Sequence, residues 1–259
     1  MPRIHILVNR KGGVGKSTFV AQLSAVTGET LGTDPVTGLP SVCALSADPQ
    51  GSLGFWMTRV DEKPFDYVQI KNRDDLETIK GLRDLPYRHI FVDSPGWIEL
   101  DDDLQLTGDT WIAKLMRALF EIADDAIVPV EVEPLSWEPT FDTVEHVLKP
   151  LGMNYITVVN NWEPRDGNAT TGYPDRDDTI TLIDGYGWNR ALSTVRHYKV
   201  HSNAPRFGQL CTQYRSNRME LNAALDFYRL AVELGLGKAQ PRMSAIEERL
   251  ETKATGSNR

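Results

Sequence analysis

Short runs of apolar residues recur along the chain, separated by stretches of helical character. The runs cover residues 4–8, 42–47, 67–70, 89–92, 126–132 and 155–159. Strands that are apolar at nearly every position are typical of a parallel sheet covered on both faces, and helices between the strands supply that cover. The pattern predicts an α/β fold: a doubly wound, mostly parallel sheet with helices on both faces and ligands at the carboxyl ends of the strands.

The same spacing places the first helix and two loops. A helix should run from Ser17 to about Gly28, because apolar residues recur on one of its faces: Phe19, Val20, Leu23 and Val26. Residues 28–40 are rich in Gly, Thr and Pro, which predicts an exposed loop. Residues 163–178 are polar and contain Gly and Pro, so we expect a mobile surface insertion there.

The last part of the chain divides into a helix and a tail. Apolar residues at helical spacing predict a final helix packed on the sheet: Leu221, Leu225, Tyr228 and Val232. Residues 238–259 contain few apolar side chains. We therefore expect one domain over residues 1–237 and a polar tail over residues 238–259, of which residues 256–259 should fray.

Charge and cysteine content narrow the class of protein. The sequence has 28 basic and 36 acidic residues and a net charge of −8, unlike a protein that coats nucleic acid. Cys43 and Cys211 lie far apart, which signals neither a disulfide framework nor a zinc site. The sequence has no apolar run of the ~18 residues that a membrane span needs and no signal-peptide pattern. We expect a soluble, cytoplasmic protein.

A glycine-rich loop lies between the first strand and the first helix. It consists of Lys11, Gly12, Gly13, Val14, Gly15, Lys16, Ser17 and Thr18. Glycines let successive backbone N–H groups face a β-phosphate, and the helix N-terminus adds its positive dipole end. Lys16 would then bridge β- and γ-phosphate oxygens, and the Ser17 hydroxyl would coordinate Mg²⁺. The sequence predicts a P-loop NTPase.

Lys11 is an additional lysine at the first position of this loop. A cation there does not easily fold back onto the phosphates of its own loop. It is placed to reach a nucleotide held by a facing subunit, where it would supply in trans the charge of an arginine finger. We therefore expect a homodimer that forms when the nucleotide is bound.

Three further motifs give the chain a family resemblance. Residues 47–52 read ADPQGS, residues 89–96 read HIFVDSPG, and residues 203–208 read NAPRFG. With KGGVGKST, they resemble the deviant Walker A ATPases, which include ParA and Soj, MinD and the nitrogenase iron protein. The resemblance extends in order to about Leu236, and the pattern is most similar to the ParA and Soj partition ATPases.

The resemblance implies roles for the acidic residues. Asp48 would position or activate the attacking water, acting with Lys11 and Lys16 in catalysis. Asp93 would hold Mg²⁺ through a water, and Asp93, Pro95 and Gly96 would form a switch that senses the γ-phosphate. The chain departs from the family at Ser46, where an aspartate is usual, and at Gly96, where many members have a second proline.

Base recognition is expected at the end of the sixth strand, where related proteins place a polar residue. Asn160 and Asn161 lie there, and a side-chain amide can pair with an adenine edge. Pro205 would flank the base. The preference for ATP over GTP rests on the resemblance, because the sequence has no NKxD-type guanine signature.

Residues 185–219 contain no Asp or Glu and carry six cations: Arg190, Arg196, Lys199, Arg206, Arg215 and Arg218. Aromatic residues lie among them: Trp188, Tyr198, Phe207 and Tyr214. A basic, aromatic window in an acidic protein indicates a surface for phosphate backbones, and the corresponding region of ParA-like proteins binds double-stranded DNA without sequence preference. A solvated basic face with aromatics in the core is the alternative.

The leading hypothesis is a DNA partition ATPase. Its ATP-bound sandwich dimer would bind the nucleoid, and a ParB-like adaptor would stimulate hydrolysis and release. One alternative is a MinD-like membrane-surface ATPase, or a related conjugation or cargo-positioning ATPase; Met243, Ile246 and Leu250 form a thin apolar stripe near the C-terminus, but acidic residues interrupt it. A reductase like the iron protein would need a pair of cysteines at the dimer axis, and the two cysteines of this chain do not lie at the required positions. Ser46 leaves open a scaffold without hydrolysis.

Overall fold

Seven parallel strands form one sheet in the computed structural model, which describes residues 1–70, 76–96, 99–101, 107–215 and 217–255. The strand order is β3-β2-β4-β1-β5-β6-β7, and every pairing is parallel. The strands are β1 (Arg3–Leu7), β2 (Val42–Ser46), β3 (Asp66–Gln69), β4 (His89–Asp93), β5 (Asp125–Glu131), β6 (Tyr155–Trp162) and β7 (Val195–Arg196). The order reverses on either side of β1, so the loop after β1 opens into a crevice between its neighbours.

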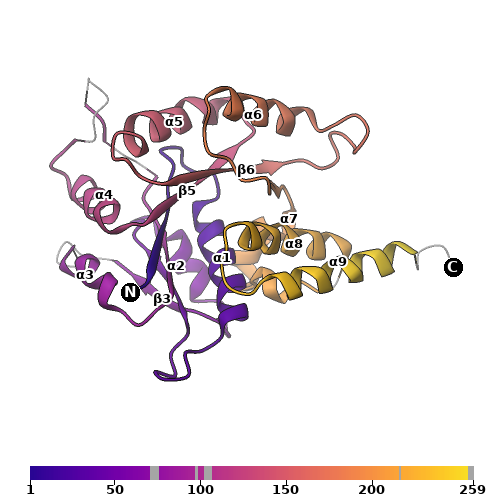
Figure 1. Cartoon of the computed structure of the whole chain (residues 1–259), viewed down its shortest axis with the longest axis horizontal. Helices are drawn as coiled ribbons and strands as arrows, with labels where there is room; N and C mark the ends of the chain where they lie inside the picture. The colour runs from indigo at the N-terminus through magenta and orange to yellow at the C-terminus, as the bar shows by residue number, and fades with distance from the viewer. Residues whose placement is uncertain (71–75, 97–98, 102–106, 216, 256–259) are drawn as a thin grey trace.

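Helices cover both faces of the sheet (Figure 1). One apolar core lies under α1 (Lys16–Leu31), α2 (Ser52–Met57), α7 (Lys199–Phe207) and α8 (Arg218–Glu233), with α9 (Gln240–Thr255) against α8. The other lies under α3 (Leu76–Lys80), α4 (Trp111–Ile122), α5 (Trp137–Phe141) and α6 (Pro174–Gly185), with a π-helical segment, Asp142–Leu148, continuing from α5. Short 3-10 turns lie at Gly81–Asp84, Pro134–Ser136 and Cys211–Gln213.

Strand alternation explains why one strand serves both cores. In β1, Ile4 and Ile6 pack into the core under α3 to α6, while Leu7 packs into the core under α1 and α8. All three side chains are fully buried. A strand covered on both faces needs apolar residues at successive positions, which is the pattern in the sequence. The predicted doubly wound parallel fold is confirmed.

The first helix differs from its prediction. It was expected to end near Gly28, but α1 continues to Leu31 and ends at Gly32, which has a left-handed φ of 66°. A Cβ at Gly28 would lie 2.2 Å from the backbone oxygen of Pro64. Glycine at this position therefore permits the close approach of the chain at Pro64 and does not mark the helix end.

Other boundaries also differ from the sequence pattern. Strand β6 continues past Asn160 and Asn161 to Trp162, and the expected insertion is shortened because α6 starts at Pro174. The short strand β7 was not identified as an apolar run. Its two residues, Val195 and Arg196, are too few to give a periodic signal.

The expected polar tail contains helix α9, which packs beside α8 at the right of Figure 1. Met243 and Ile246 are partly buried against the core under α1 and α8. Residues 256–259, which were expected to fray, lie outside the described residues. Among the helices that the structure describes, none is long and apolar enough to cross a membrane.

Candidate nucleotide site

The glycine loop connects the end of β1 to the first residue of α1. Gly13 and Gly15 adopt left-handed φ angles of 83° and 91°, and Gly15 caps the helix. Residues other than glycine rarely adopt this backbone conformation, so these two positions require the glycines that the motif supplies. The loop therefore turns its backbone toward the N-terminus of a 16-residue helix, as an anion site requires.

Asn9 fixes the start of this loop, and the sequence analysis gave it no role. Its Nδ2 donates to the backbone oxygen of Pro129 at 3.0 Å and to Thr140 Oγ1 at 2.8 Å. Its Oδ1 accepts a hydrogen bond of 2.9 Å from the Lys11 N–H. Asn9 is fully buried, so its amide joins β1, β5 and α5 at the point where the loop begins. The signal in the sequence was a polar residue directly after an apolar strand.

Lys16 is held inside the loop by backbone carbonyls. Its Nζ donates to the oxygens of Asn9 and Lys11, each at 3.1 Å, and only 7% of the residue is exposed. Burial lowers the pKa of Lys16, although the charges of Asp93 and Asp48 oppose that shift. Two neutral acceptors compensate an ammonium group less well than phosphate oxygens do, so the buried lysine is ready to exchange carbonyls for an anion.

Ser17 and Asp93 meet beside the lysine. Ser17 Oγ donates a 2.7 Å hydrogen bond to Asp93 Oδ2, while Asp93 Oδ1 is buried without a hydrogen-bond partner among the described residues. Burial raises the pKa of Asp93 to about 7, and the Ser17 hydrogen bond only partly opposes this effect. A hydroxyl and a carboxylate oxygen are ligand types that Mg²⁺ prefers, and a cation here would stabilise the charged carboxylate. The two residues therefore fit a magnesium ion.

The expected switch residues follow Asp93 and contact the loop. Pro95 is buried, and a Cβ built on Gly96 would lie 3.5 Å from both Gly12 Cα and Lys16 Nζ. Gly96 therefore lies against the glycine loop, where a larger residue would fill the space beside the lysine. The two residues that follow it, Trp97 and Ile98, are outside the described part of the chain.

Asp48 stabilises a turn and also lies near the glycine loop. Its Oδ1 accepts a 2.9 Å hydrogen bond from the Gln50 N–H, which is the pattern of an Asx turn. Its charge also acts on Lys16 and Asp93, whose pKa values it raises. Ser46, at the end of β2, is fully buried opposite Asp93 in the sheet register. An aspartate at that position would place a second buried carboxylate beside Asp93, at a large desolvation cost.

A polar hollow of about 230 Å³ lies beside Gly13, Gly15 and Thr18. Asn160 and Asn161 both line it, but both amides already have partners. Asn160 Nδ2 donates to the Val14 oxygen at 2.8 Å, so this residue holds the glycine loop. Asn161 has a left-handed φ of 63° and donates to Glu131 Oε1 at 2.8 Å.

Two histidines in this hollow were missed by the sequence analysis. His197 Nδ1 lies 2.6 Å from Asn161 Oδ1, and His201 packs its ring against Tyr214 and Phe227. Both ring nitrogens of His201 are buried and have no hydrogen-bond partner in the described chain, and burial lowers its pKa to about 4. Pro205 lies in α7 and is not among the residues that line the hollow.

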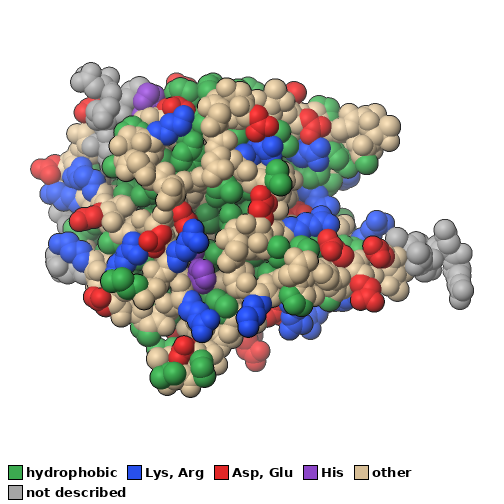
Figure 2. Space-filling model, in the orientation of Figure 1, with side chains coloured by type: hydrophobic (Ala, Val, Ile, Leu, Met, Phe, Trp, Pro, Cys, Tyr) green, Lys and Arg blue, Asp and Glu red, His purple; other side chains and the backbone are tan. Residues whose placement is uncertain are grey.

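The six cations of the acid-free window do not share one open face. Arg196 pairs with buried Asp226 at 2.5 Å and its side chain is 17% exposed, while Arg190 pairs with Asp184 at 3.0 Å. The exposed cations are Lys199, Arg206, Arg215 and Arg218. Over α8 and α9, Figure 2 shows basic side chains interspersed with acidic ones.

The aromatic residues of the window also divide. Trp188 and Tyr214 belong to the cores, as the alternative reading of the sequence had it. Phe207 is 60% exposed, and the Arg206 guanidinium lies 5.6 Å from its ring centre. The exposed cations of the window therefore lie in α7, just before α8 and at the first residue of α8.

These features define a P-loop nucleotide site. They are a glycine loop at the N-terminus of a helix, a buried lysine, and a serine paired with an aspartate at the end of the neighbouring strand β4. No family model matches the chain. The maintenance of carboxysome distribution protein A from Gloeobacter kilaueensis is 26% identical over 236 residues, 90% of this chain and 94% of that protein. The site and the motifs resemble those of the ParA/MinD type of deviant Walker A ATPases, and the similarity to this relative supports that resemblance.

Solved structures with the same fold agree with this resemblance at the level of the fold alone. The ATP complex of an McdA variant from Cyanothece has a TM-score of 0.65 at 14% identity, covering 92% of this chain and 98% of that one. The Mg-ADP complex of the septum site-determining protein MinD from Pyrococcus horikoshii has a TM-score of 0.60 at 20% identity, covering 90% of this chain and 96% of that one.

Proposed function

We propose that this protein is an ATP-dependent positioning ATPase that works as a nucleotide-switched dimer. The observation that carries the proposal is the arrangement around Lys16: a desolvated ammonium inside a glycine loop, with Ser17 and Asp93 beside it. Backbone N–H groups and Lys16 hold the triphosphate, and Ser17 with Asp93, the latter through a water, holds Mg²⁺. The bound ion neutralises charge that develops on the phosphates.

The remaining residues of the site act on hydrolysis and its consequences. Asp48 positions the attacking water, and Asp93, Pro95 and Gly96 report whether the γ-phosphate is present. Gly96 lies against Gly12 and Lys16, so a phosphate held by this lysine changes the surroundings of the switch directly. In this scheme the base occupies the hollow at Asn160 and Asn161.

Lys11 acts across the dimer interface. Its backbone N–H is fixed by Asn9, while its side chain is partly exposed at the outer edge of the loop. A lysine anchored in this way presents its charge to a facing nucleotide at little entropic cost. Two subunits related by twofold symmetry would each supply one such lysine.

DNA is the proposed track, and the exposed cations Lys199, Arg206, Arg215 and Arg218 are the proposed contacts. A few cations per subunit bind duplex weakly, and dimerisation doubles them, so binding depends on ATP. The protein is then cytoplasmic, associates with the nucleoid in its ATP form, and releases DNA when a ParB-like adaptor stimulates hydrolysis. The cargo is a DNA molecule or another assembly, since one relative is named for carboxysome distribution.

A membrane track is less favoured because of α9. Met243 and Ile246, which an amphipathic membrane helix would present to lipid, pack against the core. Arg229 of α8 also pairs with Glu247 of α9 at 2.8 Å. A helix held in this way offers lipid little apolar surface.

The test is duplex binding against salt, with ATP, with ADP and without nucleotide. Binding should need ATP, tolerate any sequence, and weaken by about 0.9 log units in affinity per phosphate contact for each log unit of salt. Reversing Arg215 and Arg218 to Glu should weaken binding to all duplexes alike and flatten that slope. Arg88→Glu with Lys238→Glu makes the same change in charge at other exposed positions and should leave binding unchanged. Equal binding in all three nucleotide states would refute the switch.

A further inference from the structure

Two buried oxygens lie near the Ser17–Asp93 pair without a hydrogen bond. Ser46 Oγ and Asp93 Oδ1 have no hydrogen-bond partner in the part of the chain that the structure describes. Their residues end β2 and β4 and are neighbours in the sheet register, so both side chains lie on the face of the sheet that α1 covers. A buried polar atom without a partner costs free energy, so the two oxygens belong to an incomplete hydrogen-bond network.

Tyr67 brings a second hydroxyl to the same place. It lies in β3, two residues before Gln69, which is the register neighbour of Ser46. Its hydroxyl donates a 3.3 Å hydrogen bond to Gln69 Oε1, which is long for two oxygens. Burial raises the pKa of Tyr67, while the Ser46 hydroxyl lowers it and the charge of Asp93 raises it further. The Tyr67 hydroxyl is therefore close to two acceptors, Gln69 and Ser46.

The first turn of α2 packs against the same side chains. A Cβ on Gly54 would lie 2.8 Å from Gln69 Oε1 and 2.9 Å from the Tyr67 hydroxyl oxygen, and a Cβ on Gly51 would lie 3.6 Å from Gln69 Nε2. The Gly51 N–H donates to the Asp48 backbone oxygen at 3.1 Å, so the start of α2 and the turn that carries Asp48 form one unit. The side chains at the end of β3 therefore support the turn on which the Asp48 carboxylate depends.

The hydroxyls of this network can adopt two arrangements, because each has only one proton to donate. In this structure Tyr67 donates to Gln69. If Tyr67 donates to Ser46 instead, the serine proton is directed to Asp93 Oδ1 and the Gln69 oxygen is released. A carboxylate that helps to hold a metal ion is oriented by hydrogen bonds of this kind, so the second arrangement suits an occupied ion site.

We propose that Tyr67 is a positioning residue for ATP hydrolysis, which couples the ion site at Asp93 to the turn that carries Asp48. With Mg²⁺ held at Asp93, Tyr67 donates to Ser46 and Ser46 donates to Asp93, and the released Gln69 lets the turn at α2 take its active position. An ionised aspartate in place of Ser46 would accept from Tyr67 but could not donate to Asp93. The inference rests on the proposed function, which assigns Mg²⁺ to Asp93 and the attacking water to Asp48.

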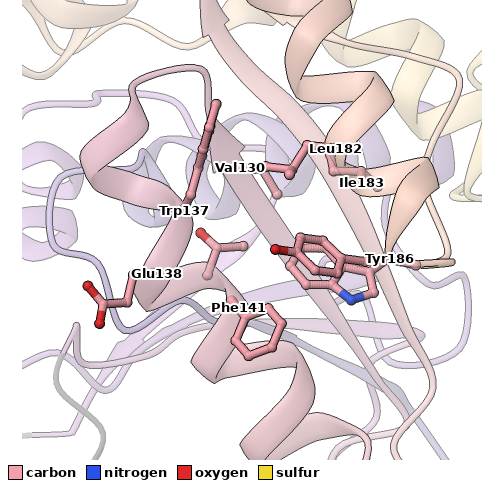
Figure 3. A pocket seen from close by; sticks show the side chains of 9 residues that line it. Val130, Trp137, Glu138, Phe141, Leu182, Ile183 and Tyr186 are labelled. Atoms are coloured by element: carbon pink, nitrogen blue, oxygen red, sulfur yellow. The ribbon is translucent and has the colours of Figure 1, made fainter.

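Hydrogen exchange over residues 47–54 tests this coupling without hydrolysis. In wild type, Mg²⁺ added to the complex with a slowly hydrolysed ATP analogue should slow exchange in this segment. Tyr67→Phe removes only the hydroxyl, so it should bind the analogue as wild type does but lose this effect of Mg²⁺. Tyr87→Phe removes another hydroxyl bonded to β3, at Asp66, and should behave as wild type. Tyr186→Phe, in the aromatic hollow between α5 and α6 on the other face of the sheet (Figure 3), should also leave exchange unchanged.

Single-turnover hydrolysis supplies the second test. Tyr67→Phe and Ser46→Ala should each slow hydrolysis about tenfold, and the double variant should be no slower than either, because the two hydroxyls act as one unit. Additive losses, a wild-type rate in either variant, or an equal effect of Mg²⁺ on exchange in wild type and Tyr67→Phe would overturn this inference alone. A wild-type protein that binds no analogue would refute the proposed function, and this inference with it.

Discussion

Ser17 of the glycine loop donates a 2.7 Å hydrogen bond to Asp93 at the end of β4, joining this loop to the strand that leads into the proposed switch. The other oxygen of Asp93 is buried without a partner among the residues described. Burial therefore favours the protonated carboxyl, and its pKa rises to about 7. A bound cation would stabilise the charged carboxylate further, so magnesium binding at this position would be linked to the proposed switch.

Asp93→Asn should abolish the strengthening of ATP binding by magnesium. The amide has the same shape and is neutral, like the protonated carboxyl that burial favours, so the protein without nucleotide should remain folded. Titration of an ATP analogue with and without Mg²⁺ measures the effect. A variant whose affinity responds to magnesium as wild type does would remove Asp93 from the ion site.

Lys16→Ala should lose most nucleotide affinity. The lysine would contribute a charged hydrogen bond to the phosphates, worth ~1.5–3 kcal/mol, and the variant leaves that phosphate charge unpaired. This corresponds to a loss of roughly ten- to 150-fold in affinity, measurable by calorimetry. Lys114→Ala, at an exposed position of α4, is the matched control. Unchanged affinity in Lys16→Ala would rule out the P-loop assignment.

Asp48→Ala should bind ATP but hydrolyse it much more slowly, so the variant accumulates in the ATP-bound dimer. The loss of the Asx turn at Gln50 could by itself disturb the loop, so Asp48→Asn, which keeps an acceptor for that N–H, separates the two roles. Single-turnover hydrolysis should be slow in both variants. Wild-type rates in Asp48→Asn would leave Asp48 with the turn alone.

His201 should make the protein sensitive to acid. Its folded pKa of about 4 lies below the ordinary 6.5, because burial opposes protonation and the charges of His197 and Arg196 add to this effect. The stability that the neutral ring allows is present above pH 6.5 and is lost as the pH falls toward 4, by at most about 3 kcal/mol. In His201→Phe, the free energy of unfolding should change less over this range. An identical pH profile would show that His201 does not titrate there.

The local parts of the site were predictable from sequence, and the parts that depend on distant contacts were not. The glycine loop follows one apolar strand and Asp93 ends another, and these positions allowed both to be predicted from the sequence. The pairing of Arg196 with Asp226 spans 30 residues, so the charge pattern suggested a free cation where the fold uses a buried ion pair. The sequence suggested that Gly28 ends the first helix. The contact that requires glycine there, with the carbonyl of Pro64, is made by another segment and is not visible in the local sequence.

The hollow at Asn160 and Asn161 shows the same limit. Both residues remain predicted to read a base, and in the structure their Nδ2 groups donate to the Val14 oxygen and to Glu131 Oε1. Sequence places a polar residue at a strand end and does not show which partner it has. His197 directly follows β7 and His201 lies in α7, where the pattern gave no signal for a pocket.

The central claim is an ATP-switched dimer in which Lys11 acts on the partner's nucleotide. Sedimentation velocity of wild type and Lys11→Ala, each with a slowly hydrolysed ATP analogue, with ADP and without nucleotide, tests it most directly. We expect a dimer only for wild type with the analogue, while Lys11→Ala should bind the analogue with nearly wild-type affinity and stay a monomer. A Lys11→Ala protein that dimerises with the analogue, or a wild type whose mass is the same in all three states, would contradict it.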